Sequence, residues 1–330
     1  MFCIIDHTTD PYWNLAAEEY LFKNFLAPVF RLWQNDNAII IGQHQNAFAE
    51  INIDYVRQNG IKVVRRLTGG GAVFHDLGNV NFTFIDNRID DEDTAMMFAR
   101  FTKPIIEVLG KLGVEAYLEG RNDLLIDGKK FSGNAVAVYR DRVLQHGTLL
   151  FSSSMGTLAN ALTSRPEKFV SKSVKSNIAR VTNISEHLVK PMTINDFIEF
   201  MEREINSINQ NLYKPYNYTD KDLKAIEKLR EEKYSRDWWN YGSSPDYQYS
   251  KVKQFPGGLI EIYMQVNKGK IADIKIFGSY FFTKETKEIE DILTGADHTP
   301  DGVAGRLEKI NLSDYFNNVA REEFLSLFWD

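Results

Sequence analysis

The stretch between residues 65 and 82 constrains the fold of this chain more than any other. Arg65 and Arg66 are followed by Leu-Thr, by three consecutive glycines at 69–71, and by Ala-Val-Phe-His-Asp-Leu-Gly-Asn-Val-Asn-Phe. Glycine allows positive φ and lets the main chain approach a ligand that a Cβ would block. Successive glycine amides can form an anion-binding concavity, and arginine adds a planar fork of donors. We therefore expect either an anion cradle between strands or a glycine-rich hairpin beside two surface arginines.

This glycine stretch does not match two familiar phosphate-binding loops. No Gly-Lys-Ser/Thr ending follows it, as a P-loop requires, and Phe74 stands where G-x-G-x-x-G needs its third glycine. A nucleotide at this site would be held in another way.

A second polar segment, residues 127–135, reads Asp-Gly-Lys-Lys-Phe-Ser-Gly-Asn-Ala. In a regularly alternating strand, Lys130, Ser132 and Asn134 would share one face. The lysine pair at 129–130 is otherwise read as solvated turn charge. Beside an anion cradle, Lys130 would instead supply the fixed positive charge that an activated carboxylate or a phosphate needs. Just upstream, the Asn-Asp pair at 122–123 would add an amide and a metal-binding carboxylate.

Histidine and cysteine give weaker signals. His75 and His146 lie in strand-like or turn-like segments and are either structural or catalytic. No His-x-x-x-His or cysteine-rich spacing predicts zinc, and no Gly-x-Ser-x-Gly elbow predicts a serine nucleophile. The single cysteine, Cys3, stands in an apolar run and is expected to be buried. We therefore expect no covalent acyl-enzyme route.

Length and charge limit the class of protein. A chain of 330 residues is long enough for two domains, and a net charge of −6 argues against nucleic acid as the main partner. The basic run Lys168, Lys172, Lys175 and Arg180 is either a solvated face or a loop near an anion. One cysteine, no signal peptide and no membrane-length apolar run predict a cytoplasmic protein without a membrane partner.

The hydrophobic pattern mixes strands with helices, which predicts an α+β protein. Strands are expected at residues 2–5, 29–33, 38–41, 62–66, 79–85, 123–126, 130–139, 143–152, 249–255, 258–266 and 271–277. Helices are expected from Asp10-Pro11 to 25 and at 96–112, 156–162, 193–208, 219–234, 286–293, 303–309 and 312–319. Pro104 should kink the second helix or open a new one capped by Thr102. The Gly-Ser-Ser-Pro at 242–245 marks the predicted domain boundary.

Together the two motifs resemble the lipoate–protein ligases, whose superfamily also includes biotin–protein ligases and octanoyl transferases. The glycine stretch is similar to the family signature Arg-Arg-x-Ser/Thr-Gly-Gly-Gly-Ala-Val-Phe/Tyr-His-Asp, and residues 130–135 are similar to Lys-x-Ser/Ala-Gly-Asn/Ser-Ala. Further matching segments are Gly42 to Asn46, Asn122-Asp123-Leu124, His146 to Leu150, Arg180 to Asn183 and, before a small accessory domain, Trp239 to Pro245.

The resemblance implies a large catalytic domain, residues 1–242, with mixed and antiparallel β-sheets flanked by helices. A linker at 243–247 and a small α+β accessory domain at 248–330 would follow. It also implies a two-step reaction in which lipoate and MgATP give lipoyl-AMP and pyrophosphate, and a lysine of a lipoyl domain then takes the lipoyl group. The acceptors would be subunits of 2-oxo acid dehydrogenases and the glycine-cleavage H protein, and the enzyme would be a monomer.

The resemblance also implies roles for individual residues. Lys130 would be catalytic, and Asp123 would bind Mg²⁺. Lipoate would be bound by Arg66, Gly69, Gly70, Gly71, His75, His146 and Gly147. ATP would be bound by Val73, Phe74, His75, Asp76, Asn79, Asn81, Asn122, Asp123, Lys130, Ser132, Asn134 and Ala135. The first helix, Ile40, Ile41 and Val73 are candidates for the apolar slot, although core packing explains them equally well.

Three other functions remain open at this stage. An octanoyl or lipoyl transferase would use a pre-activated donor without ATP, but Cys3 does not match the family position of a thioester cysteine. A biotin ligase lacks support because no Gly-Arg-Gly-Arg loop is present. A non-enzymatic module that binds lipoate or nucleotide would need the same cradle without the chemistry of Lys130.

Overall fold

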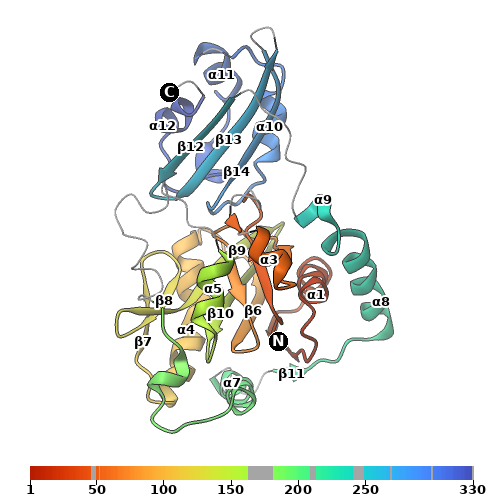
Figure 1. The fold of residues 1–330 in the computed structure, drawn as a ribbon, viewed down its shortest axis with the longest axis vertical. Coiled ribbons are helices and arrows are strands. Elements are labelled where there is room, and N and C mark those ends of the chain that lie inside the picture. Colours follow the sequence, from red (N-terminus) through yellow and green to blue (C-terminus); the bar gives the residue numbers. More distant parts are fainter. Residues whose placement is uncertain are drawn as a thin grey trace.

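The computed structural model describes residues 1–45, 50–51, 53–162, 181–208, 213–240, 249–267, 270–298 and 300–328. A large N-terminal domain is built on an eight-stranded sheet, and a small C-terminal domain on a three-stranded sheet (Figure 1). This confirms the predicted α+β fold with mixed and antiparallel sheets and a small second domain. The predicted boundary at 242 and linker at 243–247 lie outside the described residues.

The large sheet has the strand order β11-β1-β2-β6-β10-β9-β8-β7. The three strands at one edge pair in parallel, and all later pairs are antiparallel. The strands are β1 (Phe2–Ile5), β2 (Val29–Trp33), β6 (Asn79–Asn87), β7 (Ala116–Glu119), β8 (Asp123–Ile126), β9 (Lys129–Tyr139), β10 (Arg142–Leu150) and β11 (Lys214–Pro215).

A separate three-stranded sheet carries the glycine stretch. Its strands are β3 (Ala38–Ile41), β4 (Lys62–Arg65) and β5 (Val73–His75), with β3 in the centre. β3 pairs in parallel with β4 and antiparallel with β5, so residues 66–72 form the connection between the two outer strands. Helices α3 (Ile53–Gln58) and α5 (Met155–Ala161) lie beside this sheet.

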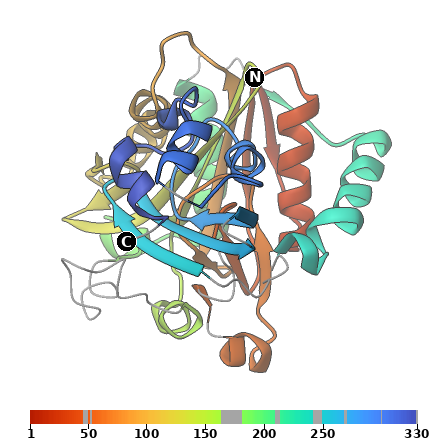
Figure 2. The same ribbon diagram turned by 90° about the horizontal axis from the view of Figure 1, so that it is seen from above.

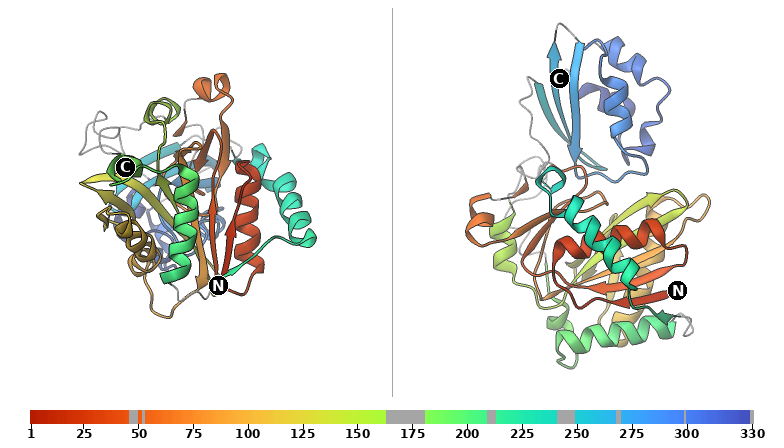
Figure 3. Two further views of the ribbon diagram at one scale, coloured as in Figure 1. Left: turned by 90° about the horizontal axis from the view of Figure 1, so that it is seen from below. Right: turned by 90° about the vertical axis from the view of Figure 1, so that its right-hand side faces the viewer.

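Helices cover both faces of the large sheet (Figure 3). α1 (Pro11–Asn24) lies on one face with α8 (Asp220–Leu229) packed outside it, and α4 (Thr94–Lys111) lies on the other with α7 (Ile194–Ile208). The remaining turns of helix are η2 (Ile184–His187), the π-helical η3 (Arg230–Tyr234) and α9 (Asp237–Asn240). Asp10 caps α1 and Pro11 stands at its first turn, as the sequence predicts.

α4 follows one of the two outcomes that the sequence left open, a single helix that runs through Pro104. It is one helix capped by Asp93, with Pro104 inside it, so Thr102 does not cap a second helix. The Thr102 hydroxyl donates instead to the Phe98 carbonyl at 2.6 Å. Six buried apolar side chains of α4 belong to the main core, and this burial offsets the backbone bond that a proline removes.

The small domain pairs β12 (Tyr249–Phe255), β13 (Gly258–Asn267) and β14 (Lys270–Gly278) antiparallel, with helices on one face (Figure 1). α10 is Lys287–Leu293, α11 is Pro300–Arg306, η4 is the 3₁₀ turn Leu312–Asp314, and α12 is Arg321–Ser326. The predicted helix at 303–309 is present but lies three residues earlier, and the predicted helix at 312–319 is wrong. Pro300 opens α11 at its first turn, and Asn318 has positive φ, which interrupts a helix before α12.

The small domain packs over one end of the large domain (Figure 2), and its Tyr280 backbone meets Gly69 of the glycine stretch. The His44 ring stacks on Tyr280 with 4.9 Å between ring centroids and meets Phe282 edge-on at 4.3 Å. Phe281 meets Phe98 of α4 at 5.4 Å and belongs to the large domain's core. Within the described residues no helix has the length and apolar character of a membrane span.

Candidate active site

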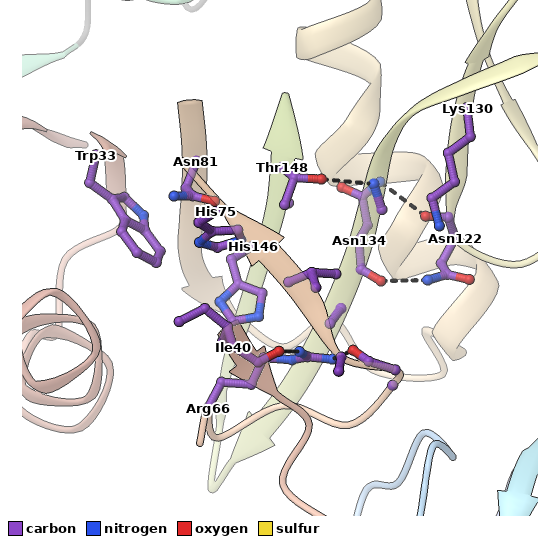
Figure 4. Close-up of a pocket in the computed structure, with 17 residues that line it drawn as sticks. Trp33, Ile40, Arg66, His75, Asn81, Asn122, Lys130, Asn134, His146 and Thr148 are labelled. Atoms are coloured by element: carbon purple, nitrogen blue, oxygen red, sulfur yellow. Dashed lines mark hydrogen bonds between the residues drawn. The ribbon is translucent and has the colours of Figure 1, made fainter. Parts of the chain in front are cut away.

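A cavity lies where the three-stranded sheet β4-β3-β5 meets strands β6, β9 and β10 of the large sheet. Figure 4 shows Trp33 at one end of it and Lys130 with Asn122 at the other, with the two histidines between. The cavity is lined by Trp33, Ile40, Arg66, Gly70, Gly71, Ala72, Val73, His75, Asn81, Asn122, Lys130, Gly133, Asn134, Ala135, His146, Gly147 and Thr148. The two segments singled out from the sequence therefore face one another across one site.

Arg66 holds the glycine connection in place. Its guanidinium donates to the carbonyls of Gly69 at 2.6 Å, Gly71 at 2.8 Å and Ile40 at 3.0 Å, and to the Thr68 hydroxyl at 2.9 Å. Burial lowers the Arg66 pKa to about 10. The protein itself therefore uses most of the donors that this arginine could offer to a ligand.

Arg65 is buried in the same way on the other side of β4. It donates to five backbone carbonyls, which belong to Gly42, Gln43, Gln45, Trp239 and Asn240, at distances of 2.6 to 3.0 Å. Burial lowers its pKa to about 10 as well. Arg65 fixes the Gly42–Gln45 turn and the end of the large domain to the cradle.

The three glycines have three different surroundings. A Cβ on Gly69 would lie 2.1 Å from the Tyr280 carbonyl oxygen, so this glycine makes room for the small domain. Gly70 has φ +94°, a conformation that side chains rarely adopt. A Cβ on Gly71 would meet nothing within 4 Å. Gly70 and Gly71 line the cavity, whereas Gly69 faces the other domain.

The lysine end of the cavity is more open. Lys130 Nζ lies 2.8 Å from Asp123 Oδ1, and the two side chains are 40% and 38% exposed. A β-bulge shifts the β8–β9 register near Leu124, so the predicted regular alternation is wrong here. A Cβ on Gly133 would lie 3.2 Å from Lys130 Nζ, while Ser132 is fully buried.

His75 presents a nitrogen to the cavity whose protonation can be deduced from its neighbours. Asn14 Nδ2 donates to Asn35 Oδ1 at 3.0 Å, which leaves Asn35 Nδ2 to donate to His75 Nδ1 at 3.1 Å. Nδ1 is then an acceptor, so the neutral ring carries its hydrogen on Nε2. Nε2 is buried without a partner among the described residues. Burial, with Arg66 and His146 nearby, lowers the His75 pKa to about 3, so the ring is a neutral donor.

His146 has both ring nitrogens engaged. Nε2 lies 2.7 Å from the Thr68 hydroxyl, and Nδ1 lies 2.9 Å from each oxygen of the Glu18 carboxylate. The ring therefore forms part of the cavity wall with fixed orientation. It has no free nitrogen for proton transfer in this arrangement.

Three asparagines complete the polar lining. Asn122 and Asn134 exchange hydrogen bonds through side-chain amides and backbone carbonyls, at 2.6 and 3.0 Å (Figure 4). Asn134 Oδ1 and Asn81 Nδ2 are buried and have no partner among the described residues. One free acceptor and one free donor inside a cavity are suited to a polar ligand.

Several residues proposed from the sequence lie outside this lining. Asp76 accepts bonds from the backbone of Gly78 and Ser154, and Asn79 donates to Asn81. Phe74 and Ile41 pack in the hydrophobic core beside the β4-β3-β5 sheet. Gly69, Asp123 and Ser132 lie next to lining residues, and no residue of α1 lines the cavity. Asn46 and the basic run from Lys168 to Arg180 fall outside the described residues.

Sequence reasoning assigned no role to Trp33, Asn35, Thr68 or Glu18, although Trp33 lines the cavity and the other three hold lining side chains through hydrogen bonds. Trp33 reads as one more strand residue, and Glu18 as one of two consecutive helical glutamates. Only their contacts with residues distant in the sequence identify them as parts of the site.

The two-domain fold and this cavity define a protein of the lipoate ligase class, and family comparison agrees. Residues 10–206 match the family model described as lipoyl protein ligase A/B catalytic domain, and residues 244–328 match bacterial lipoate protein ligase C-terminus. The chain belongs to the lipoate–protein ligase family.

Individual relatives cover the full length. The chain is 44% identical to Lipoate-protein ligase LplJ of Bacillus subtilis (strain 168), over 97% of each chain. It is 39% identical to Lipoate--protein ligase 1 of Staphylococcus aureus (strain Mu50), over 98% of each. The crystal structure of P. falciparum LipL1 with lipoate has a TM-score of 0.77 at 26% identity and covers 98% of this chain and 97% of that one. A lipoate-protein ligase A bound with ATP has a TM-score of 0.64 at 27% identity, covering 73% and 98%.

Proposed function

We propose that this chain is an ATP-dependent lipoate–protein ligase that forms lipoyl-AMP and transfers the lipoyl group to a lysine of a lipoyl domain. One observation carries the proposal: the lysine segment and the glycine cradle face each other across a single cavity whose far end is closed by Trp33 (Figure 4). An acyl chain would lie toward Trp33, Ile40 and Val73. Its carboxylate would then meet the α-phosphate near Lys130.

Lys130 is proposed as the catalytic residue. The attack of a carboxylate oxygen on the α-phosphate brings two anions together, forms a carboxyl–phosphate bond and releases pyrophosphate. An ammonium group beside the reacting atoms stabilises the charge on that phosphate. Lys130 is paired to a half-exposed Asp123, so an incoming phosphate can compete for it. In the second step Lys130 would hold the carbonyl oxygen while the acceptor amine displaces AMP.

The cradle side is proposed to position the ligand through neutral donors. His75 Nε2 offers an N–H to a carboxylate or phosphate oxygen, and Asn81 and Asn134 offer a donor and an acceptor. Arg66, Gly70 and Gly71 would shape the backbone against which the adenylate lies. Lipoate contacts are also proposed for Gly69, His146 and Gly147, and ATP contacts for Val73, Phe74, Asp76, Asn79, Asn122, Asp123, Ser132 and Ala135.

A magnesium ion fits this site only with help from the substrate. No cluster of three metal-ligating side chains exists within the described ranges, but Mg²⁺ commonly uses one carboxylate and the phosphates of its nucleotide. Asp123 would supply that carboxylate after Lys130 turns to the phosphate. Bound there, the ion would neutralise phosphate charge.

The acceptors are proposed to be lipoyl domains of 2-oxo acid dehydrogenase subunits and the glycine-cleavage H protein. An archaeal ligase studied with its E2 lipoyl domain, from Thermoplasma acidophilum, is 30% identical to this chain over 75% of its length. We further propose a cytoplasmic monomer; the single cysteine, which cannot form an internal disulfide, is typical of a reducing compartment.

A cysteine-dependent transferase is disfavoured by the position of Cys3. The thiol lies in the main core and does not line the active-site cavity. Burial and the nearby Glu202 raise its pKa to about 12, so it stays protonated and unreactive at neutral pH.

Two linked assays test the proposed function. Lipoate-dependent exchange of labelled pyrophosphate into ATP measures adenylation, and the mass of an apo lipoyl domain measures transfer. We expect exchange that requires lipoate, and a lipoyl mass increase. Transfer from synthetic lipoyl-AMP without any exchange would instead identify a transferase, and neither signal would indicate a binding module.

A further inference from the structure

Two hydrogen-bond chains start at the wall of the cavity and end on the same buried carboxylate. That carboxylate belongs to Glu18 of α1, which is 1% exposed and does not itself line the cavity. One chain begins at the lining residue Arg66 and passes through a second lining residue, His146, and the other begins at the lining residue Trp33.

The first chain has one consistent direction when the His146 ring is neutral. Arg66 Nε donates to Thr68 Oγ at 2.9 Å, so the Thr68 hydroxyl hydrogen is available for His146 Nε2 at 2.7 Å. A neutral His146 ring that accepts at Nε2 must carry its hydrogen on Nδ1. Nδ1 then donates to Glu18, with 2.9 Å to each oxygen. In each hydrogen bond of this chain the donor lies nearer the guanidinium and the acceptor lies nearer the carboxylate.

The second chain comes from the Trp33 end of the cavity. Trp33 Nε1 donates to Thr83 Oγ at 2.9 Å, and the Thr83 hydroxyl donates to Glu18 Oε1 at 2.7 Å. Indole nitrogen can only donate, so this chain also runs toward the carboxylate. Thr83 lies opposite His146 in the β6–β10 register, which brings both chains to one point.

Glu18 is suited to be the common end because an ionised carboxylate only accepts. Burial opposes its ionisation, but interactions with His146, Thr83 and Arg31 outweigh burial and hold the Glu18 pKa below its ordinary value. Because a charged acceptor forms stronger hydrogen bonds than a neutral one, both chains are fixed in direction.

We propose that Glu18 is a positioning residue that orients three parts of the acyl-adenylate site. These are the Trp33 ring, the His146 ring and, through Thr68 and Arg66, the glycine connection. The effect on catalysis rests on the proposed function, whereas the effect on the His146 ring does not. Glu18 contacts no ligand in this account, and it acts through the groups that it holds.

The matched control is the next residue of the same helix. Glu19 is also buried and accepts hydrogen bonds, but its partners are Lys23, Lys233 and Tyr234, none of which lines the cavity. Replacing either glutamate by glutamine removes one buried charge from α1. Only Glu18→Gln places an amide NH₂ group against the His146 Nδ1 hydrogen.

The test combines a ligand-free measurement with a kinetic one. Nitrogen NMR of the His146 imidazole in the intact protein should show hydrogen on Nδ1 in the wild type and in Glu19→Gln, and a shift of hydrogen to Nε2 in Glu18→Gln. In lipoate-dependent pyrophosphate exchange, Glu18→Gln should raise KM for lipoate on the order of tenfold to a hundredfold, the range for losing a hydrogen bond to a charged group. Glu19→Gln should leave KM unchanged.

Two results would overturn the proposal. One is a wild-type ring with its hydrogen on Nε2, which needs no variant to be folded. The other is a Glu18→Gln protein that matches Glu19→Gln in both ring protonation and KM. If the wild type shows no lipoate-dependent exchange, the proposed function fails, and the NMR comparison alone decides whether Glu18 positions the ring.

Discussion

The two walls of the cavity place their positive charges in opposite ways. On the cradle wall, residues 62–75, the arginines at 65 and 66 are 5% exposed and donate to carbonyls of the protein. On the lysine wall, residues 122–135, Lys130 is 40% exposed and pairs with one half-exposed carboxylate. The arginines of the cradle wall thus already have hydrogen-bond acceptors within the protein, whereas Lys130 can exchange its partner for a ligand.

This difference indicates that the cradle wall sets the shape of the cavity, whereas the lysine wall supplies a charge that can act on a ligand. A guanidinium with four internal partners stabilises a backbone conformation, and it loses those bonds if it turns to a ligand. A half-exposed ammonium group loses little when its partner changes, because exposed ion pairs are weak. Changes on the cradle wall should therefore affect stability, and changes on the lysine wall should affect rate.

The largest effect on stability is expected from Arg65→Met. It leaves five carbonyls of the cradle without their donor, and buried unsatisfied groups of this kind cost about 1 to 3 kcal/mol each before relaxation. We expect a loss of about 3 to 5 kcal/mol in the free energy of unfolding by denaturant titration. Lys130→Met is the control and should change it by less than about 1 kcal/mol. Equal losses of unfolding free energy in the two variants would show that the two walls do not differ in their contribution to stability.

A smaller effect is expected from Gly69→Ala. Its new methyl group would overlap the Tyr280 carbonyl, so the small domain must shift, at a cost of about 1 to 3 kcal/mol. Small-angle scattering should show a larger radius of gyration than for the wild type. Gly71→Ala, which meets nothing within 4 Å, should scatter like the wild type without ligand. An unchanged profile for Gly69→Ala would show that the domain contact does not depend on this glycine.

The buried histidines make stability depend on pH. Burial lowers the pKa of His75 and of His44 to about 3, against an ordinary value near 6.5, so the unfolded chain binds more protons between these values. Stability should be full above pH 6.5 and fall as the pH drops, by up to about 1.4 kcal/mol per pH unit for each histidine. Denaturant titrations between pH 6.5 and 5 measure this slope. His75→Gln should reduce it, and an unchanged slope would contradict the buried neutral ring.

The smallest effect on stability is expected from Asp123→Asn. The ion pair with Lys130 is exposed enough to contribute about 0 to 1 kcal/mol, so unfolding should barely change. If Asp123 also holds the magnesium of the nucleotide, the variant should need more Mg²⁺ for half-maximal pyrophosphate exchange. A magnesium titration checks this, and superimposable curves would remove Asp123 from the metal site.

The fold was predictable from the sequence where the local pattern and the tertiary structure agree. The strands at 29–33 and 38–41 and the capped helix after Asp10 follow from apolar runs and a cap residue that local chemistry explains. Pro104 left two outcomes open in the sequence, and the packing of α4 favours the continuous helix over local propensity. The late helices shifted because the aromatic turn at Tyr315 and Phe316 is buried as core rather than wound into a helix.

The site was predictable in part. Glycine, arginine and lysine at unusual density identify both walls, and the structure places Arg66 and Lys130 on one cavity. Sequence alone does not show that the Arg66 donors are already used, because their acceptors are backbone carbonyls. Nor does it show that Glu18 rather than Glu19 reaches the site, since that depends on the rotation of α1 against β10.

One measurement tests the separation of the two walls most directly: single-turnover formation of lipoyl-AMP by Lys130→Ala beside the wild type, with unfolding followed on the same samples. We predict a loss on the order of 10²-fold or more in the adenylation rate, the scale for removing one strong transition-state donor, with the free energy of unfolding unchanged. An adenylation rate equal to that of the wild type would contradict it, because the charge that activates the carboxylate would then have to come from the cradle.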